Sequence, residues 1–192
     1  MLKESIDKIF AERTCYKFLP QEIPDQLLQE IYDVMKLGPT SANCCPLRIT
    51  FVKSSPEKEK LYSCLSPTNI DKVKSAPITA IFAYDIKFYE RLDKLSPHNP
   101  NIKDYFLSSH EITLETAFRN STLQAAYFMI IARSRGLDCG PMSGFNEMEA
   151  TNVFFPNSSY RANFLCNLGY KEDNNPYPRA PRLDFAEACK II

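Results

Sequence analysis

Gly38-Pro39-Thr40-Ser41-Ala42-Asn43-Cys44-Cys45-Pro46 separates an amphipathic helical pattern from an apolar strand pattern. Upstream, apolar residues recur at helical spacing over residues 27–35, and Gly38-Pro39 supplies a flexible residue followed by one that cannot continue a helix. Downstream, residues 47–52 are expected to form a strand. Polar groups at such a junction can face a ligand, although an ordinary surface loop would show the same small polar residues.

The rest of the chain alternates between helical and strand patterns. Helices are predicted from about residue 5 to residue 13, from Pro24-Asp25, from Ser55-Pro56 to about residue 65, and around residues 88–92. Apolar strands are predicted at residues 78–84 and 162–168, and a proline-containing loop at residues 96–101. This alternation predicts a layered α+β or α/β domain with a mixed sheet flanked by helices.

One helical segment, residues 113–135, contains neither proline nor glycine and is apolar nearly all round. A helix of this kind has to be covered on every side. We therefore expect it to be a core helix, a subunit-interface helix, or both, and to end at Gly136.

The composition excludes several classes of protein. The 192 residues are enough for one well-buried core, and no linker divides them, so residues 1–192 are expected to form a single domain. Lys plus Arg and Asp plus Glu number 23 each, so no overall field recruits nucleic acid or an anionic membrane. Neither a run of about 20 apolar residues nor the apolar segment of a signal peptide is present, which predicts a cytoplasmic protein.

The seven cysteines form an odd set without CxxC spacing. Cys44 and Cys45 are adjacent, a geometry that rarely makes a structural bridge or a tetrahedral metal site by itself. We expect reduced, mostly buried thiols, with neither a disulfide framework nor a bound metal.

Four further motifs accompany the loop at residues 38–46. They are Arg13-Thr14-Cys15-Tyr16-Lys17, Asn69-Ile70-Asp71-Lys72, Pro141-Met142-Ser143-Gly144-Phe145 and Arg179-Ala180-Pro181-Arg182. Together these segments resemble the flavin-binding segments of the nitroreductase family, over essentially the whole chain. The resemblance is closest to the compact branch that includes the malonic semialdehyde reductase of pyrimidine breakdown. It implies a nitroreductase-like three-layer fold and an intertwined homodimer.

The resemblance also implies which residues bind flavin mononucleotide (FMN). A guanidinium offers paired donors to phosphate oxygens, so the candidate phosphate ligands are Arg13, Arg179 and Arg182. Asn69 and Lys72 lie one helical turn apart and, with Lys17, match family positions that face the flavin ring. Further positions that match the family's flavin contacts are Thr14, Cys15, Pro141, Met142, Ser143 and Gly144.

The loop after the second predicted helix corresponds to the segment that reaches the flavin from the partner subunit, through Pro39, Thr40, Ser41 and Asn43. The chain departs from the family at Cys45, where glutamine is common. A thiol cannot reproduce the donors and the acceptor of a carboxamide, so the contact at this position is expected to differ.

The resemblance implies an FMN-dependent oxidoreductase that takes hydride from NADPH or NADH and passes it by a ping-pong scheme to a small electron-poor acceptor, such as a nitroaromatic, a quinone or an aldehyde. The chain has no GxGxxG motif after a strand, so the nicotinamide is expected in the same open pocket as the acceptor. One alternative is a specific malonic semialdehyde reductase that forms 3-hydroxypropanoate, with Arg119 or residues 96–101 binding its carboxylate. Another is a flavin-binding protein without turnover.

Overall fold

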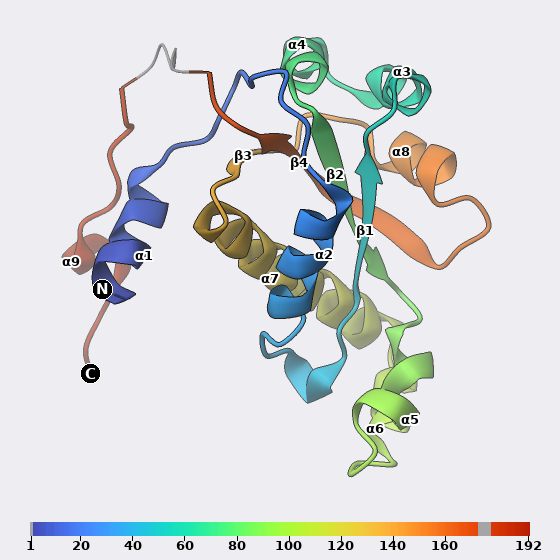
Figure 1. Cartoon of the computed structure of the whole chain (residues 1–192). Helices are drawn as coiled ribbons and strands as arrows, with labels where there is room; N and C mark the ends of the chain where they lie inside the picture. The colour runs from blue at the N-terminus through green and yellow to red at the C-terminus, as the bar shows by residue number, and fades with distance from the viewer. Residues whose placement is uncertain (1, 173–177) are drawn as a thin grey trace.

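The computed structural model of the chain describes residues 2–172 and 178–192 and contains a four-stranded sheet at its centre (Figure 1). The strands stand in the order β1 (Leu47–Val52), β2 (Ile78–Asp85), β4 (Tyr160–Gly169) and β3 (Asp138–Met142). All three neighbouring pairs are antiparallel. The α+β class is confirmed, but the prediction of a mixed sheet is wrong for the described residues. Strand direction is decided by the path of the connections, which the local sequence pattern does not contain.

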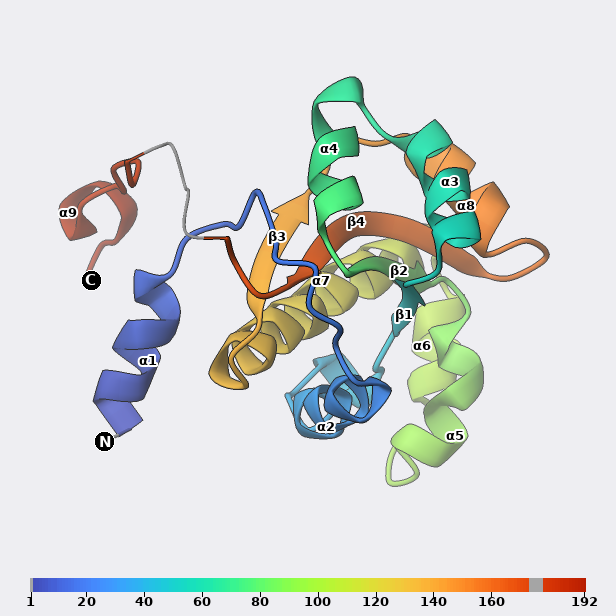
Figure 2. The ribbon, with the colours of Figure 1, turned by 45° about the horizontal axis from the view of Figure 1, so that its top comes forward.

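Both faces of the central strand β2 are buried. Successive side chains of a strand point to opposite faces of the sheet, so β2 contributes to a separate apolar cluster on each face. Ile78, Ala80 and Phe82 pack into one apolar cluster with α2 (Asp25–Met35) and α7 (His110–Ser134). Ile81 and Ala83 pack into a second cluster with α3 (Ser55–Cys64), α4 (Pro67–Ser75) and α8 (Glu147–Phe154). The sheet is thus the middle of three layers, as Figure 2 shows from a second side.

Helix α7 is the predicted long helix, and it packs across the sheet (Figure 1). Gly136, which follows its end, has φ 86, a left-handed conformation that glycine adopts without a Cβ clash. The complete burial of Ala125 and Phe128 confirms that α7 has a face in the core. Within one chain it is not covered on every side, since Phe118 remains 51% exposed.

The predicted short helices at residues 5–13 and 88–92 are confirmed with shifted bounds, as α1 (Leu2–Ala11) and as η2 (Phe88–Arg91) followed by α5 (Leu92–Leu95). Three short helices were not predicted: η1 (Ser41–Asn43), within the loop at residues 38–46, α6 (Ile102–Leu107) and α9 (Phe185–Ala188). Strand β3 was not predicted, and it contains Gly140-Pro141. It pairs with β4 at the edge of the sheet, a position where proline is tolerated.

Both chain ends lie to one side of the sheet, where α1 and α9 stand apart from the three layers (Figures 1 and 2). Large apolar side chains on this side are exposed, among them Phe10 at 56% and Phe185 at 66%. Across the described parts of the chain, none of the helices combines the length and the apolar character needed to span a bilayer.

Candidate functional site

Asn69 in α4 joins the turn after β3 to its own helix. Its side-chain Nδ2 donates to the carbonyl of Gly144 at 2.9 Å, and its Oδ1 accepts from Nζ of Lys72 at 2.9 Å. Asn69 is buried, and these two bonds fix the orientation of its carboxamide. The predicted helical-turn spacing of Asn69 and Lys72 is confirmed as a direct contact.

The contact between Asn69 and this turn requires a glycine at position 144. The carbonyl of Gly144 also accepts from the backbone N–H of Ser66, which precedes α4, at 3.0 Å. A Cβ at position 144 would lie 2.6 Å from Nδ2 of Asn69, closer than real Cβ contacts come. The absence of a side chain therefore lets the turn at residues 141–144 approach α4.

The segment at residues 13–17 lies between β3 and α4. Its backbone N–H at Cys15 donates to the carbonyl of Cys139 in β3 at 3.0 Å. On the other side, Nζ of Lys72 lies 5.2 Å from the centre of the Tyr16 ring, in cation–π range. Three of the five predicted segments, residues 13–17, 69–72 and 141–144, are thus brought together by the fold.

Cys15 and Lys17 differ in what they present. The Cys15 thiol is buried and donates to the carbonyl of Lys17 at 3.1 Å, and burial raises the pKa of this thiol to about 11. Since its backbone N–H is also bonded, Cys15 uses both donors within the chain. The ammonium of Lys17 is exposed and lies 2.7 Å from the carboxylate of Glu172.

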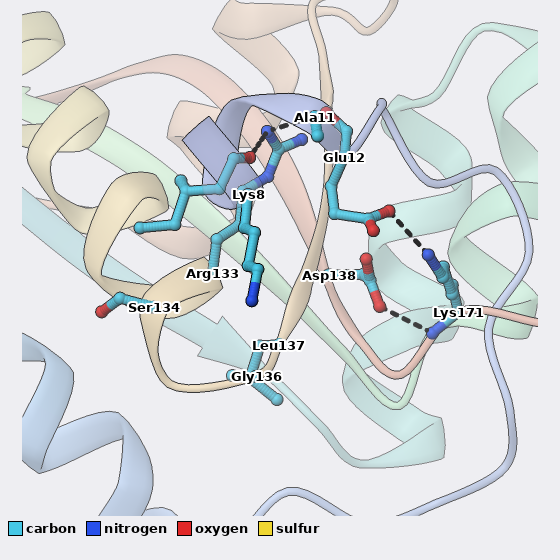
Figure 3. Close-up of a pocket in the computed structure, with 10 residues that line it drawn as sticks. Lys8, Ala11, Glu12, Arg133, Ser134, Gly136, Leu137, Asp138 and Lys171 are labelled. Atoms are coloured by element: carbon cyan, nitrogen blue, oxygen red, sulfur yellow. Dashed lines mark hydrogen bonds and ion pairs between the residues drawn. The ribbon is translucent and has the colours of Figure 1, made fainter. Parts of the chain in front are cut away.

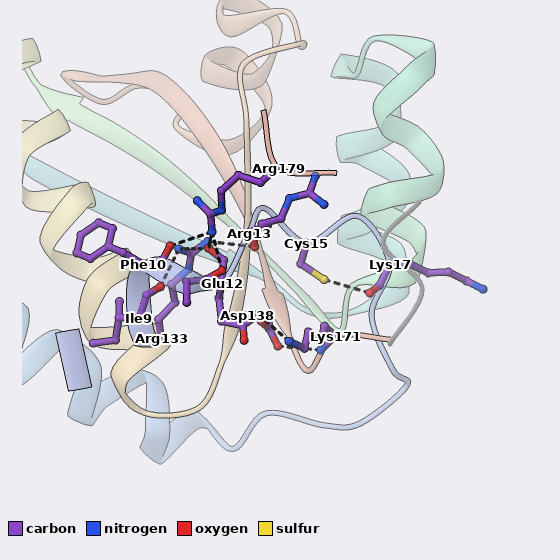
Figure 4. A network of polar contacts seen from close by, with 11 residues as sticks. Ile9, Phe10, Glu12, Arg13, Cys15, Lys17, Arg133, Asp138, Lys171 and Arg179 are labelled. Atoms are coloured by element: carbon purple, nitrogen blue, oxygen red, sulfur yellow. Dashed lines mark hydrogen bonds and ion pairs between the residues drawn. The ribbon is translucent and has the colours of Figure 1, made fainter. Parts of the chain in front are cut away.

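The predicted phosphate ligands are not all brought together. Figure 4 shows Arg13 and Arg179 as neighbours at the end of α1. Nη2 of Arg179 donates to the carbonyls of Phe10 and Ala11 at 3.0 and 2.6 Å, so it caps that helix. Arg182 instead donates to the carbonyls of residues 180 and 181, both at 3.0 Å. No described contact joins Arg182 to the other two arginines, because its guanidinium folds back on its own segment.

A further arginine near this site was not predicted. Arg133, in the last turn of α7, donates from Nη2 to the carbonyl of Arg13 at 3.2 Å and from Nη1 to the carbonyl of Ile9 at 3.3 Å (Figure 4). It therefore ties the start of the site to the core helix. A single basic residue at a helix end is too common a pattern to have identified this role.

A cavity of about 510 Å³ lies beside these arginines, between α1 and the end of α7 (Figure 3). Arg133 lines it, together with an ion pair in which Nζ of Lys171 lies 2.6 Å from Oε2 of Glu12. The backbone N–H of Lys171 donates to Asp138 at 2.9 Å. Charges of both signs thus line the cavity, and two of them, Glu12 and Lys171, form an ion pair.

The loop at residues 38–46 lies at the opposite end of the sheet. The carbonyl of Pro46 accepts from the N–H of Asp85, the last residue of β2, at 3.0 Å. Helix α4 instead precedes the first residue of β2, Ile78. A strand of eight residues is roughly 25 Å long. Pro39, Thr40, Ser41 and Asn43 are therefore not brought to residues 69–72 and 141–144 within one chain.

The two adjacent cysteines of this loop lie in different environments. Cys44 is fully buried against Phe88 and Phe106, and burial raises the pKa of its thiol to about 12. Cys45 is half-buried at the surface, with Sγ 3.5 Å from Oδ1 of Asn43. All seven cysteines are free and five of them are buried, which confirms the expectation of mostly buried thiols.

The family model for the nitroreductase family matches residues 9–170 of the chain. A protein of Ralstonia pickettii, provisionally named NADH dehydrogenase/NAD(P)H nitroreductase HadB, is 47% identical over 190 residues, with 97% of each chain covered. A protein of Cupriavidus pinatubonensis, provisionally named NADH dehydrogenase/NAD(P)H nitroreductase, is 46% identical over 191 residues, covering 98% of this chain and 97% of that one.

Among solved structures, a provisionally named nitroreductase of Exiguobacterium sibiricum in complex with FMN has a TM-score of 0.87 at 18% identity. The match covers 98% of this chain and 96% of that one, and it establishes the likeness of the fold. The family match extends over most of the chain, and both relatives are aligned over nearly their full length. The chain therefore belongs to the nitroreductase family.

Proposed function

We propose that this protein is an FMN-dependent NAD(P)H oxidoreductase that passes hydride to a small electron-poor acceptor by a ping-pong scheme. The observation that carries the proposal is the meeting of Asn69, Lys72 and the Gly144 turn with residues 13–17. The provisional names of the relatives, which are NAD(P)H nitroreductases, and the FMN complex of the Exiguobacterium protein support it.

The donor set at this place fits FMN. The phosphate would be held by Arg13 and Arg179, which both lie at the end of α1 (Figure 4). Although Nη2 of Arg179 caps α1, a guanidinium carries five N–H donors, so one side chain can serve both the helix end and a phosphate. Lys72 would place a positive charge near the flavin ring, next to the fixed carboxamide of Asn69. When bound, FMN supplies the capacity to accept hydride and to release it.

The second half of the site would come from a second copy of the chain. Ser41 and Asn43 lie in an exposed loop roughly 25 Å, the length of β2, from the first half. A partner chain that covers the exposed Phe118 of α7 would bring its own loop to the flavin. In this homodimer, Pro39, Thr40 and Cys45 would also belong to the partner-facing loop.

The acceptor is proposed as a general electron-poor molecule. A malonic semialdehyde reductase would need a cation for the substrate carboxylate. Of the two candidates for that role, residues 96–101 contain no lysine or arginine, and Arg119 is exposed on α7 and forms an ion pair with Glu115 one turn earlier. This arrangement favours a nitroaromatic, quinone or aldehyde acceptor over a carboxylate-bearing one.

The proposal is tested by titrating the purified protein with FMN and mixing the complex with NADPH and with NADH in a stopped-flow spectrometer. We expect tight FMN binding, bleaching of the flavin absorbance by at least one nucleotide, and reoxidation by a panel of nitroaromatics and quinones. Failure to bind FMN would overturn the proposal. Binding without reduction by either nucleotide would show a flavin-binding protein without turnover.

A further inference from the structure

The loop before β1 has an unusual backbone. Ala42, Asn43 and Cys45 have φ values of 50, 52 and 40, and among the described residues only one other non-glycine residue, Asn157, has a positive φ. Left-handed backbone is unfavourable for residues with a Cβ, and it persists where surrounding contacts hold it. The loop therefore needs an external support.

Helix α7 supplies that support at both ends of the loop. Oδ1 of Asn120 accepts from the backbone N–H of Ser41 at 2.8 Å, and Oε1 of Gln124 accepts from the backbone N–H of Leu47 at 3.0 Å. Asn120 and Gln124 are four residues apart, so they lie on the same face of α7. Two side chains of one rigid helix thus hold the two ends of a seven-residue segment.

Both carboxamides are buried, Asn120 at 2% exposure and Gln124 at 4%. Buried amides are unfavourable unless their hydrogen-bonding groups are paired. Nδ2 of Asn120 donates to the carbonyl of Thr116 at 2.9 Å, which turns its oxygen toward the loop. An apolar residue at either position would avoid the cost of desolvating an amide. The two amides are therefore explained by the hydrogen bonds that they make to the loop.

We propose that Asn120 and Gln124 are positioning residues that clamp residues 41–47 in the conformation the loop needs to serve the flavin of the partner subunit. The part of this inference that brings the loop to the flavin of the partner subunit rests on the proposed function. The clamp itself rests on the two buried hydrogen bonds and the left-handed residues between them.

The experiment compares Asn120→Ala and Gln124→Ala with the wild type and with Asn163→Ala. Asn163 is the matched control because it is also a buried amide, and its Nδ2 donates to Thr122 of α7 at 2.9 Å rather than to the loop. A fourth variant, Asn120→Asp, keeps an oxygen that can accept from the N–H of Ser41. Three quantities are measured on each purified protein: amide hydrogen-exchange protection along the chain, the melting temperature and the Kd for FMN.

We expect protection of residues 41–47 to fall roughly tenfold or more in both alanine variants, while the rest of α7 keeps its protection. The Kd for FMN should rise about tenfold in both, and neither quantity should change in Asn163→Ala beyond what its melting temperature explains. Asn120→Asp keeps the acceptor for the N–H of Ser41 but loses the donor to Thr116, so it should lose less loop protection than Asn120→Ala. This set of results would support the clamp.

Two results would overturn it. Unchanged loop protection, or a loss spread evenly over every helix, would show that the amides serve general stability. Lost loop protection with an unchanged Kd for FMN would show that the held loop does not serve the flavin. Failure of the proposed function is seen separately, as a wild type that does not bind FMN, and the exchange comparison then still decides whether the two amides hold the loop.

Discussion

Arg48 of β1 and Asp85 at the end of β2 form an ion pair with Nη2 of Arg48 2.6 Å from Oδ2 of Asp85, and their side chains are only 19% and 5% exposed. The other carboxylate oxygen accepts from the hydroxyl of Ser159 at 2.6 Å. From its second nitrogen, Nη1, Arg48 donates to the carbonyl of Cys45 at 3.0 Å. The pair therefore joins β1, β2 and the residue before β4 to the loop at residues 38–46.

Arg48→Met should lower the free energy of unfolding by about 3 kcal/mol, because it leaves the buried Asp85 without its counter-charge. The matched control is Lys53→Met, at the residue that follows the same strand, where the pair with Asp25 is exposed and the loss should be under about 1 kcal/mol. Urea denaturation of both variants measures the difference. Equal losses would mean that burial of the Arg48 pair has no energetic consequence.

Gly144→Ala should weaken FMN binding roughly tenfold, because the new Cβ would lie 2.6 Å from Nδ2 of Asn69 and displace that carboxamide together with Lys72. The control is Gly136→Ala, where a Cβ meets nothing within 4 Å and only the left-handed backbone is strained. Fluorescence titration with FMN compares the two. If Gly136→Ala weakens FMN as much as Gly144→Ala does, the Asn69 contact is not what holds the flavin.

Stability should fall at alkaline pH because of the buried thiol of Cys44. Burial raises its pKa from the ordinary 9.0 to about 12, so between these values the unfolded chain holds fewer protons than the native state and the free energy of unfolding decreases as pH rises. The slope should reach up to about 1.4 kcal/mol per pH unit for this thiol. Urea denaturation between pH 8 and pH 10.5, roughly spanning the start of that range, should show a shallower decline in Cys44→Ala.

The control for this pH series is Cys189→Ala, since Cys189 is exposed and its removal should leave the wild-type slope intact. The same decline in Cys44→Ala as in the wild type would assign the alkaline loss to other groups, such as the buried Cys15.

Cys45→Gln should shift the midpoint potential of bound FMN or the rate of its reduction by NADPH, because it restores a carboxamide at a position proposed to face the flavin. The melting temperature should stay close to that of the wild type, since Cys45 is half-buried in a loop. Cys44→Gln, one residue earlier and fully buried, should instead lower the melting temperature by many degrees. A Cys45→Gln variant that melts lower while its potential is unchanged would show that this thiol serves packing.

The protein should be a homodimer with two flavin sites. The exposed Phe118 of α7 and Phe185 of α9 provide apolar area for the partner. The proposed flavin site also takes its loop at residues 38–46 from a second copy of the chain. Light scattering should give about twice the 22.0 kDa mass of one chain. A flavin-loaded, active monomer would contradict both the dimer and the proposed origin of the loop.

Short-range patterns predicted the parts of this protein that short-range physics controls. The apolar run at residues 78–84 lies in the doubly buried β2, and the helical spacing of Asn69 and Lys72 became a direct contact. Periodicity reports which faces are apolar, and proline or glycine reports where an element ends. Both can be read from a few neighbouring residues.

Tertiary structure decided the rest, since those features depend on residues far apart in the sequence. The antiparallel direction of the sheet follows from its connections, and β3 forms because β4 lies beside a segment that by itself resembles a turn. Asn120 bonds Ser41 across 79 residues, and Arg133 bonds Arg13 across 120. A local pattern contains no record of such partners, because their pairing is selected by the packing of α7 against the whole sheet.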